Sequence, residues 1–249
     1  SGAVYDKKYN IFQSDKAFFH EVAQELSLKA IGEGDEARYV RHPLAFLVEA
    51  ADDICYTLID FEDGINLGWI PEEHALEYLI QLIRGSKIKP ENITEKYYRL
   101  SHKQDRIAYL RALSIGTLIG EAVALFEENE ESLLRGDFTT SLLEKSKYKH
   151  QIKDIIDLSV SNIYQSPQVV EKELAGYAIL QHLLRVYFTA VYHKWHGTTS
   201  SYDHIILKTV PTRYLLEEEE LYEQILAITC YVASLTDTQT TKLHSKLNG

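Results

Sequence analysis

The chain has 249 residues, of which 45% are hydrophobic, and a formal net charge of −11 at pH 7. This size and composition are enough for a packed core and exclude a mainly disordered chain. The negative charge argues against a protein whose main role is to coat nucleic acid or an anionic membrane. The 12 glycines and 5 prolines are too few for the many tight turns of an all-β sandwich or barrel, so long helices are expected.

Two cysteines, Cys55 and Cys230, lie far apart in the sequence, so we expect no disulfide framework and a reducing, cytoplasmic setting. No stretch approaches 18 uncharged apolar residues, and no basic segment precedes a short apolar run. Neither a membrane span nor a signal peptide is therefore expected. The chain lacks methionine and opens with Ser1 and Gly2, so we also expect that the gene product begins upstream of residue 1.

Apolar residues recur with the period of an α-helix along most of the chain, with breaks where Gly, Pro or Asn gather. We expect helices near residues 15–29, 43–62, 71–84, 91–100, 103–128, 138–146, 148–163, 168–195 and 214–244. Prolines and glycines mark several of their ends, with starts at Pro43, Pro71 and Pro167 and stops at Gly64, Gly85 and Gly197.

The least regular stretch is residues 196–213, where Ile205, Ile206 and Leu207 are expected to form a short strand inside a loop. No repeat is visible, and no linker rich in Gly, Ser or Pro divides the chain. The sequence therefore predicts an all-α, multi-helix architecture that forms a single region over residues 1–249.

The expected helix at residues 43–62 contains most of the candidate site residues. Its apolar residues, among them Cys55, cover an arc of roughly 220°, which predicts a mostly buried helix. Asp52, Tyr56 and Asp60 lie at positions i, i+4 and i+8 on the remaining acidic face, and no Lys or Arg occurs between His42 and Ile83. Neighbouring carboxylates repel one another. The face is therefore either a solvated stripe or a carboxylate-lined cavity for a divalent metal or a basic partner.

The run from His42 to Tyr56, HPLAFLVEAADDICY, continues through Asp60 to Glu62–Ile65. This segment closely resembles the deoxyguanosine triphosphate triphosphohydrolases of the HD phosphohydrolase superfamily. The resemblance extends more loosely over most of the chain, to residues 12–19, 169–177, 234–237 and 246–249. It identifies the chain as similar to the C-terminal half of such an enzyme.

The resemblance implies a divalent metal held by two His and two Asp, and hydrolysis of dGTP to deoxyguanosine and triphosphate. Asp52 matches the last metal ligand, and Tyr56 matches the tyrosine that touches the phosphates. Asp60 matches the carboxylate that binds the sugar hydroxyl, and Lys16 matches a phosphate-binding lysine. Glu173 is similar, more loosely, to a residue near the base or sugar. The resemblance also implies a homo-oligomer and a dNTP or single-stranded DNA as effector.

The chain departs from this pattern because it contains no His-Asp dipeptide, whereas the family takes its first three metal ligands from a His and a His-Asp pair upstream of the residue matched by Asp52. The reversed pair Asp203-His204 follows Asp52 and cannot replace them. We therefore expect no catalytic residues in this chain and an inactive fragment of a longer enzyme. The alternative is a non-catalytic helical module for oligomerisation or nucleotide sensing.

Three other features have an ordinary explanation beside a functional one. His193 and His196 have a spacing that could clasp a metal, or they are polar residues at a helix end. A basic cluster is either an anion-binding surface or a solvated face. It consists of Lys145, Lys147, Lys149 and Lys153, with Tyr148 and His150. Cys55 lies on the apolar arc, so we expect no nucleophilic role for it.

Overall fold

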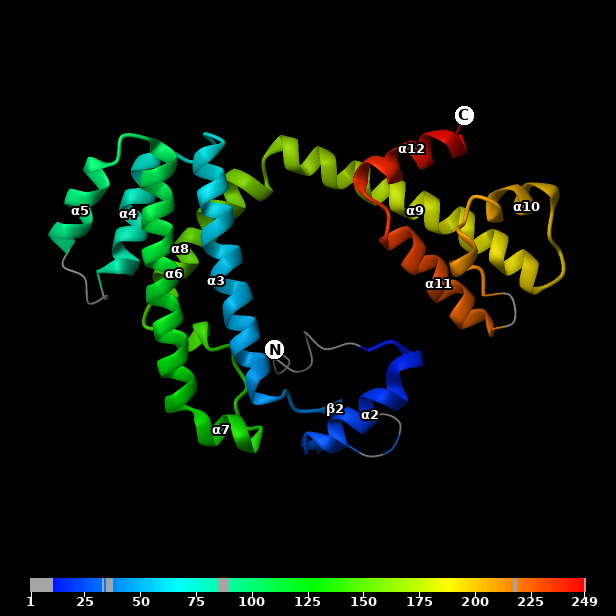
Figure 1. The fold of residues 1–249 in the computed structure, drawn as a ribbon, viewed down its shortest axis with the longest axis horizontal. Helices are drawn as coiled ribbons and strands as arrows, with labels where there is room; N and C mark the ends of the chain where they lie inside the picture. Colours follow the sequence, from blue (N-terminus) through cyan, green and yellow to red (C-terminus); the bar gives the residue numbers. More distant parts are fainter. Residues whose placement is uncertain (1–10, 33, 35–37, 85–89, 217–218, 249) are drawn as a thin grey trace. The chain divides into compact units, whose positions relative to one another are not determined.

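The computed structural model describes residues 11–32, 34, 38–84, 90–216 and 219–248, and the structural statements below concern these residues. They are mostly helical, with one two-stranded sheet, which confirms the all-α prediction (Figure 1). Contacts divide the chain into two compact units, Ser1–Ser166 and Pro167–Gly249. That residues 1–249 form a single α-helical region of a longer protein stays a prediction.

Unit 1 holds the acidic helix. Its elements, in chain order, are η1 (Gln13–Asp15), α2 (Lys16–Glu25), β1 (Ala30–Ile31), β2 (Arg38–Tyr39), α3 (Pro43–Asn66), α4 (Glu72–Ile83), α5 (Pro90–Arg99), α6 (Lys103–Glu128), α7 (Glu130–Arg135), η3 (Leu143–Lys145), α8 (Lys149–Ser159) and the π-helical turn η4 (Val160–Tyr164). The two short strands pair antiparallel, with Ala30 opposite Tyr39.

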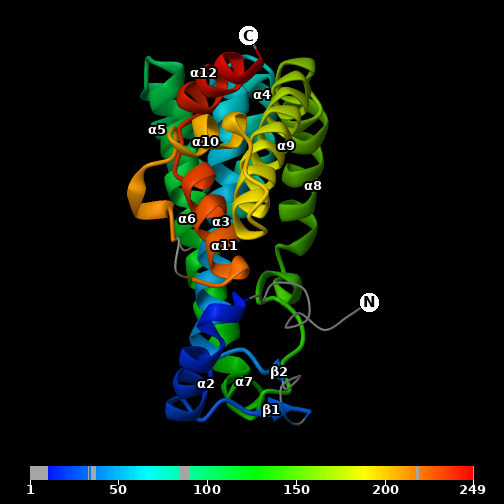
Figure 2. The same ribbon diagram turned by 90° about the vertical axis from the view of Figure 1, so that its right-hand side faces the viewer.

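The core of unit 1 is a bundle in which α3 packs against α6 and α8, and α4 packs against α6 (Figures 1 and 2). One face of α3 is buried in this bundle, and these buried residues are Phe46, Ala50, Ile54, Leu58, Phe61 and Ile65. Two ion pairs join α6 to its neighbours: Arg111 binds Glu62 of α3, and Arg106 binds Glu72 of α4. The acidic helix is therefore held in place along its whole length.

Local sequence explains where α3 begins. Pro43 occupies the first turn, where its missing N–H costs nothing, and His42 Nδ1 accepts a hydrogen bond of 3.2 Å from the N–H of Leu44. The predicted stop at Gly64 is wrong, because the helix continues to Asn66. A Cβ at Gly64 would lie 2.6 Å from Ile163 Cδ1, so this glycine allows close packing. The stop predicted at Gly85 lies outside the described residues.

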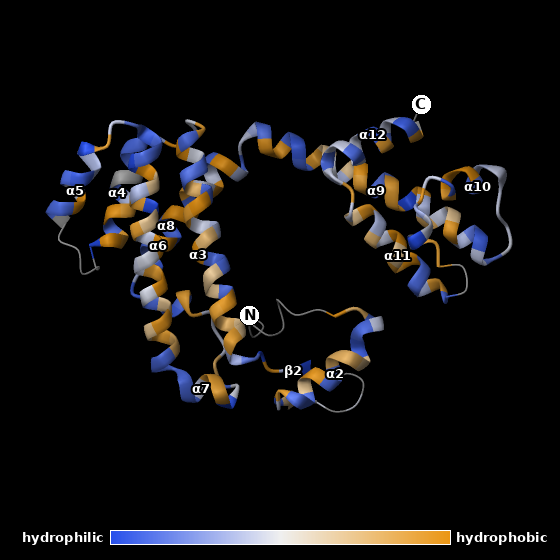
Figure 3. Ribbon diagram, in the orientation of Figure 1, coloured by the Kyte–Doolittle hydropathy of each residue, from blue (hydrophilic) through white to orange (hydrophobic). Residues whose placement is uncertain are grey.

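Helix α6 is, in the described part of the chain, the one helix long and apolar enough to cross a membrane by length and composition alone. One face of α6, with Ile107, Leu110 and Leu118, is buried in the core of unit 1. Its opposite face leaves Ile119 and Val123 about half exposed. In Figure 3, hydrophobic and hydrophilic colours alternate along α3, whereas α5 is mostly hydrophilic.

The helix expected at residues 138–146 does not form. Gly136, with a φ of 73°, ends α7, and only the 3₁₀ turn η3 follows. Leu142 and Leu143 are both buried in the core of unit 1, so they anchor this segment without a longer helix.

Unit 2 consists of α9 (Pro167–Trp195), α10 (Ser201–Leu207), η5 (Thr212–Tyr214), α11 (Leu221–Ala233) and α12 (Asp237–Asn248). The predicted start at Pro167 is confirmed, and Gly197, with a φ of 67°, follows the end of α9 as predicted. The single helix expected at residues 214–244 is broken. Thr236 and Gln239 cap each other reciprocally and start α12 as a separate helix.

The strand predicted at Ile205–Leu207 is wrong, because these residues belong to α10. Ser200 accepts a hydrogen bond from the N–H of Asp203, whose carboxylate accepts from the N–H of Ser200, so a capping box starts the helix. Asp203 also binds His193 Nδ1 at 3.0 Å. The hydrogen bonds from Ser200 and His193 lower the pKa of Asp203 to about 2. His193, in the last turn of α9, is therefore bound by the Asp203 carboxylate that caps α10.

Candidate functional site

Helix α3 has a second apolar face that the chain leaves exposed. Val48 is 70% exposed, Ile59 is 40% exposed, and Cys55 is exposed as well. The expectation that the helix is mostly core, with Cys55 on its buried arc, is wrong, because the structure buries only half of that arc. Large exposed apolar faces mark surfaces that another element covers.

The carboxylates of interest lie beside this exposed apolar face. Asp52 is exposed and Tyr56 is 54% exposed, whereas Asp60 is half-buried. All three project from the same side of α3, as their spacing predicts. The structure therefore brings together three of the predicted site residues on one accessible surface.

Tyr164 joins this surface from the π-helical turn η4, and the sequence gives no local sign of its role. Its hydroxyl donates a hydrogen bond to Asp60 Oδ2. Its ring stacks on that of Tyr56, with ring centroids 5.7 Å apart and an interplanar angle of 11°. Burial, followed by the bond to Asp60, raises the pKa of Tyr164 above the usual tyrosine value. Tyr164 therefore fixes both the Asp60 carboxylate and the Tyr56 ring.

Replacing Tyr164 by phenylalanine removes the hydroxyl and keeps the ring. We expect the free energy of unfolding of unit 1 to fall by about 1 kcal/mol near pH 7, because one hydrogen bond to a carboxylate is lost. The raised pKa means that this stabilisation is fully present below about pH 10 and is lost as the pH rises from there toward the folded-state pKa. The difference between wild type and Tyr164→Phe should therefore shrink above about pH 10. Urea unfolding between pH 7 and pH 11 measures it.

Tyr98→Phe is the matched control, because Tyr98 is 69% exposed in the same unit. This variant should match the wild type at every pH. A Tyr164→Phe variant as stable as the wild type at pH 7 would show that the bond to Asp60 contributes nothing.

Lys16 and Glu173 are not shown to join the surface around Tyr56. Lys16 begins α2, which lies beyond the N-terminal end of α3 in both views (Figures 1 and 2). Glu173 is exposed in the first half of α9, in unit 2. Their predicted contacts with a nucleotide stay predictions.

The predicted metal does not fit this chain alone. Among the described residues no three His, Cys, Asp or Glu side chains gather closely enough to hold a metal ion. Asp52 could therefore supply one ligand, as the resemblance implies, but the described residues do not complete a site around it.

Two of the four lysines of the basic cluster pair with carboxylates. Lys147 binds Glu121 at 2.9 Å, and Lys153 binds Asp157. Lys145 Nζ donates to Asn129 Oδ1 at 3.1 Å. These contacts favour the interpretation of a solvated face. The side chain of Lys149, at the start of α8, pairs with no side chain in the described part of the chain.

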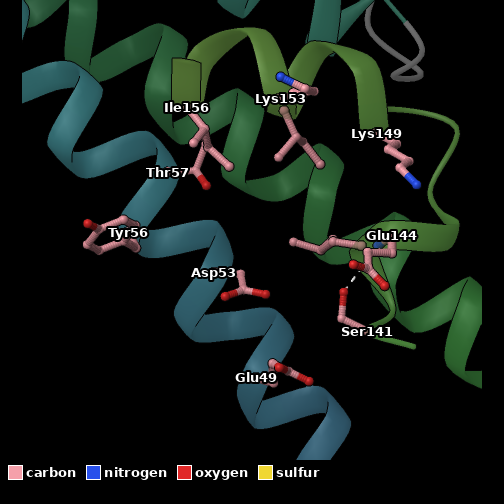
Figure 4. Close-up of a pocket in the computed structure, with 11 residues that line it drawn as sticks. Glu49, Asp53, Tyr56, Thr57, Ser141, Glu144, Lys149, Lys153 and Ile156 are labelled. Atoms are coloured by element: carbon pink, nitrogen blue, oxygen red, sulfur yellow. Dashed lines mark hydrogen bonds between the residues drawn. The ribbon is translucent and has the colours of Figure 1, made fainter. Parts of the chain in front are cut away.

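A cavity of about 520 Å³ lies between α3 and α8, next to the carboxylate face (Figure 4). Tyr56 lines it, together with Glu49, Asp53 and Thr57 from a neighbouring row of α3. Glu49 is fixed by Arg41, whose Nη1 donates to its carboxylate at 2.5 Å. Glu49 and Asp53 belong to the acidic face that is expected from the sequence, whereas the position of Thr57 beside them was not predicted.

The fold and this surface define an all-α protein with a carboxylate-bearing helix that is packed on one side and open on the other. No known family model matches the chain. It is 35% identical over 244 residues to a deoxyguanosinetriphosphate triphosphohydrolase-like protein of Synechocystis, which covers 98% of this chain and 52% of the relative. A protein of the same name from Listeria monocytogenes is 27% identical over 265 residues, covering 99% of this chain and 55% of the relative.

A deoxyguanosinetriphosphate triphosphohydrolase of Serratia proteamaculans is 28% identical over 194 residues, covering 73% of this chain and 36% of that enzyme. The chain spans about half the length of the first two curated relatives. It is therefore a homologue of one part of the deoxyguanosinetriphosphate triphosphohydrolase-like proteins, and the predicted resemblance is confirmed.

Proposed function

We propose that this chain is part of a metal-dependent dNTP triphosphohydrolase that converts dGTP and water to deoxyguanosine and triphosphate. The observation that carries the proposal is the exposed side of α3, where Asp52, Tyr56 and Asp60 lie beside uncovered apolar residues. A further segment that covers the apolar residues would also enclose the three polar ones.

Each residue of this surface has a role that suits its chemistry. Asp52 is exposed and can act as one ligand of a divalent metal whose other ligands come from outside the described residues. The Tyr56 hydroxyl can donate a hydrogen bond to a phosphate oxygen. Asp60, held by Tyr164, can accept a hydrogen bond from a sugar hydroxyl. Tyr164 is thus a positioning residue in this proposal.

The chain alone should be inactive, because one carboxylate cannot hold the metal that the resemblance implies. The test compares this chain with the full-length protein that contains it, each incubated with dGTP and Mg²⁺ or Mn²⁺. We expect triphosphate and deoxyguanosine from the full-length protein, loss of both products with EDTA, and no product from the chain alone. Release of pyrophosphate by the full-length protein would contradict the proposed reaction.

The alternative is a non-catalytic helical module for oligomerisation or nucleotide sensing. It predicts that no His and His-Asp pair precedes residue 1 in the gene. It also predicts that the full-length protein releases no triphosphate. Reading the upstream codons separates the two functions before any assay.

A further inference from the structure

We infer that protonation of His182 releases helix α12 from α9, so that the last helix of unit 2 packs only while this histidine is neutral. The inference goes beyond the proposed hydrolysis and concerns a different compact unit from the one that holds the carboxylate face. It rests on one buried ring nitrogen without a partner, on the positive groups around it and on the sparse packing that holds α12.

His182 lies at the contact between α9 and α12. Its ring meets the ring of His244 edge to face, with the ring centroids 5.0 Å apart and an interplanar angle of 89°. The Nδ1 atom of His182 is buried and has no hydrogen-bond partner in the described part of the chain. The two helices therefore meet through an imidazole that has one nitrogen enclosed by the packing.

Only the neutral form of His182 suits this position. A neutral imidazole carries one N–H, so the buried Nδ1 can remain unprotonated, whereas an imidazolium carries an N–H on both nitrogens. Protonation would thus create a buried donor without an acceptor, together with a charge removed from water. Once α12 is released, water can accept from the same N–H. Protonation of His182 therefore favours the released state.

The charged groups beside His182 also oppose its protonation. Arg185 lies one turn further along α9, and His244 faces the ring from α12. Burial, followed by His244 and Arg185, lowers the pKa of His182 below its usual value near 6.5. Because the packed state binds the proton less readily than the released state, α12 packs at full strength above about pH 6.5 and less as the pH falls below that value.

Helices α10 and α11, which also pack against α9, do not bring a carboxylate to the buried imidazole. From α11, the ring of Tyr231 packs against Tyr187, and Glu223 lies more than two turns before Tyr231. From α10, Asp203 binds His193 in the last turn of α9. None of these groups contributes to the lowered pKa of the imidazole.

Helices α9 and α12 themselves offer no compensating charge at this point. The stretch of α9 from residue 174 to residue 195 contains no Asp or Glu. On α12, Lys242 and Lys246 are exposed and lie two positions from His244, so they project from other sides of the helix. Asp237 begins α12, about two turns before His244. A protonated imidazole here would therefore face positive groups without a balancing carboxylate.

Helix α12 is held by few apolar contacts. Leu243 and Leu247 are the only large apolar residues among its 12, and each is only partly buried against the core of unit 2. Thr240 is buried, but its hydroxyl donates to the carbonyl of Thr236 and not to another helix. Segments with little buried apolar surface open more readily than the rest of a fold. Protonation of one side chain is therefore enough to shift the packing of α12.

Release of α12 uncovers part of α9. A cavity of about 600 Å³ in unit 2 is lined by Ile179 and Leu180 of α9 and by Thr240 and Thr241 of α12. Without α12 this cavity loses one wall, and more of the apolar surface of α9 faces water. The pH therefore controls whether this surface is covered.

Hydrogen exchange of the 249-residue chain, measured by mass spectrometry at pH 7.5 and pH 5.5, tests the inference. Each peptide is corrected for the intrinsic exchange rate at that pH. A histidine that is protonated only in the released state weakens the packing by up to about tenfold over this interval. A released helix of this length is marginal in water, so its amides then exchange. We expect the protection of α12 to fall about three- to tenfold, while peptides of α9 and α11 keep theirs.

Variants identify the group that responds to pH. His182→Phe and His182→Gln remove the titratable ring, and the first keeps an aromatic ring against His244 while the second keeps a polar side chain. In both variants α12 should be equally protected at the two pH values. Arg185→Gln should reduce the fall, because it removes a positive charge that opposes protonation. His204→Gln is the matched control, since His204 is an exposed histidine of the same unit, and it should show the wild-type fall.

Three results would overturn the inference. The first is equal protection of α12 at both pH values in the wild type. The second is a fall that persists in both His182 variants and disappears in His244→Phe. The third is an equal loss of protection in α9, α11 and α12, which would indicate acid unfolding of the whole unit. No nucleotide enters the measurement, so its outcome is independent of the proposed function.

Discussion

Replacing Asp52 by alanine in the full-length protein should lower triphosphate release from dGTP by more than about a hundredfold. The proposed function makes Asp52 a metal ligand, and even residues that only support such ligands change activity about 10- to 100-fold. Initial rates of triphosphate formation at saturating Mn²⁺ measure the effect. The result would connect the exposed side of α3 directly to the reaction.

Asp63→Asn is the matched control for that experiment, because Asp63 is an exposed carboxylate near the end of the same helix. It should retain activity within about twofold, because surface changes of this kind have small effects. Full activity of the Asp52→Ala variant, or equal losses in both variants, would remove the basis for placing the metal at Asp52.

Replacing Phe61 by alanine should destabilise unit 1 by about 3–5 kcal/mol. Phe61 is fully buried on α3 and contacts the ring of Tyr78 edge to face, so its removal leaves a cavity in the bundle. Urea unfolding followed by tryptophan fluorescence measures the change. Trp195→Phe serves as the background, so that Trp69 reports unit 1 alone.

Ile59→Ala on the same helix is the control for core packing, because Ile59 is 40% exposed. It should cost less than about 1 kcal/mol. Similar losses for the two variants would mean that α3 does not bury the face that contains Phe61.

Several helices could be predicted from the sequence because their signals are local. The apolar period predicted one helix at residues 103–128, where α6 begins and ends. Pro167 marked the start of α9 within one residue. The run from Ile205 to Leu207 misled because β-branched residues favour strands, whereas the Ser200 and Asp203 capping box determines the structure there.

The candidate site was predictable only along α3 itself. Helical spacing places Asp52, Tyr56 and Asp60 on one side whatever the rest of the fold does. Tyr164 is 104 residues from Asp60 in sequence, so its hydrogen bond depends on tertiary packing that no local pattern reveals. Periodicity also could not show that half of the apolar arc, with Cys55, faces outward, because it identifies apolar faces and not what covers them.

The 24 residues of helix α3 meet three different structural requirements. One side packs the bundle, a second presents Asp52 and Tyr56, and a third lines the cavity with Asp53 and Thr57. Substitutions on these three sides are expected to be costly, whereas exposed positions outside them, such as Ile59 and Asp63, should stay tolerant. One helix therefore has to satisfy core packing, the proposed chemistry and the lining of a cavity at the same time.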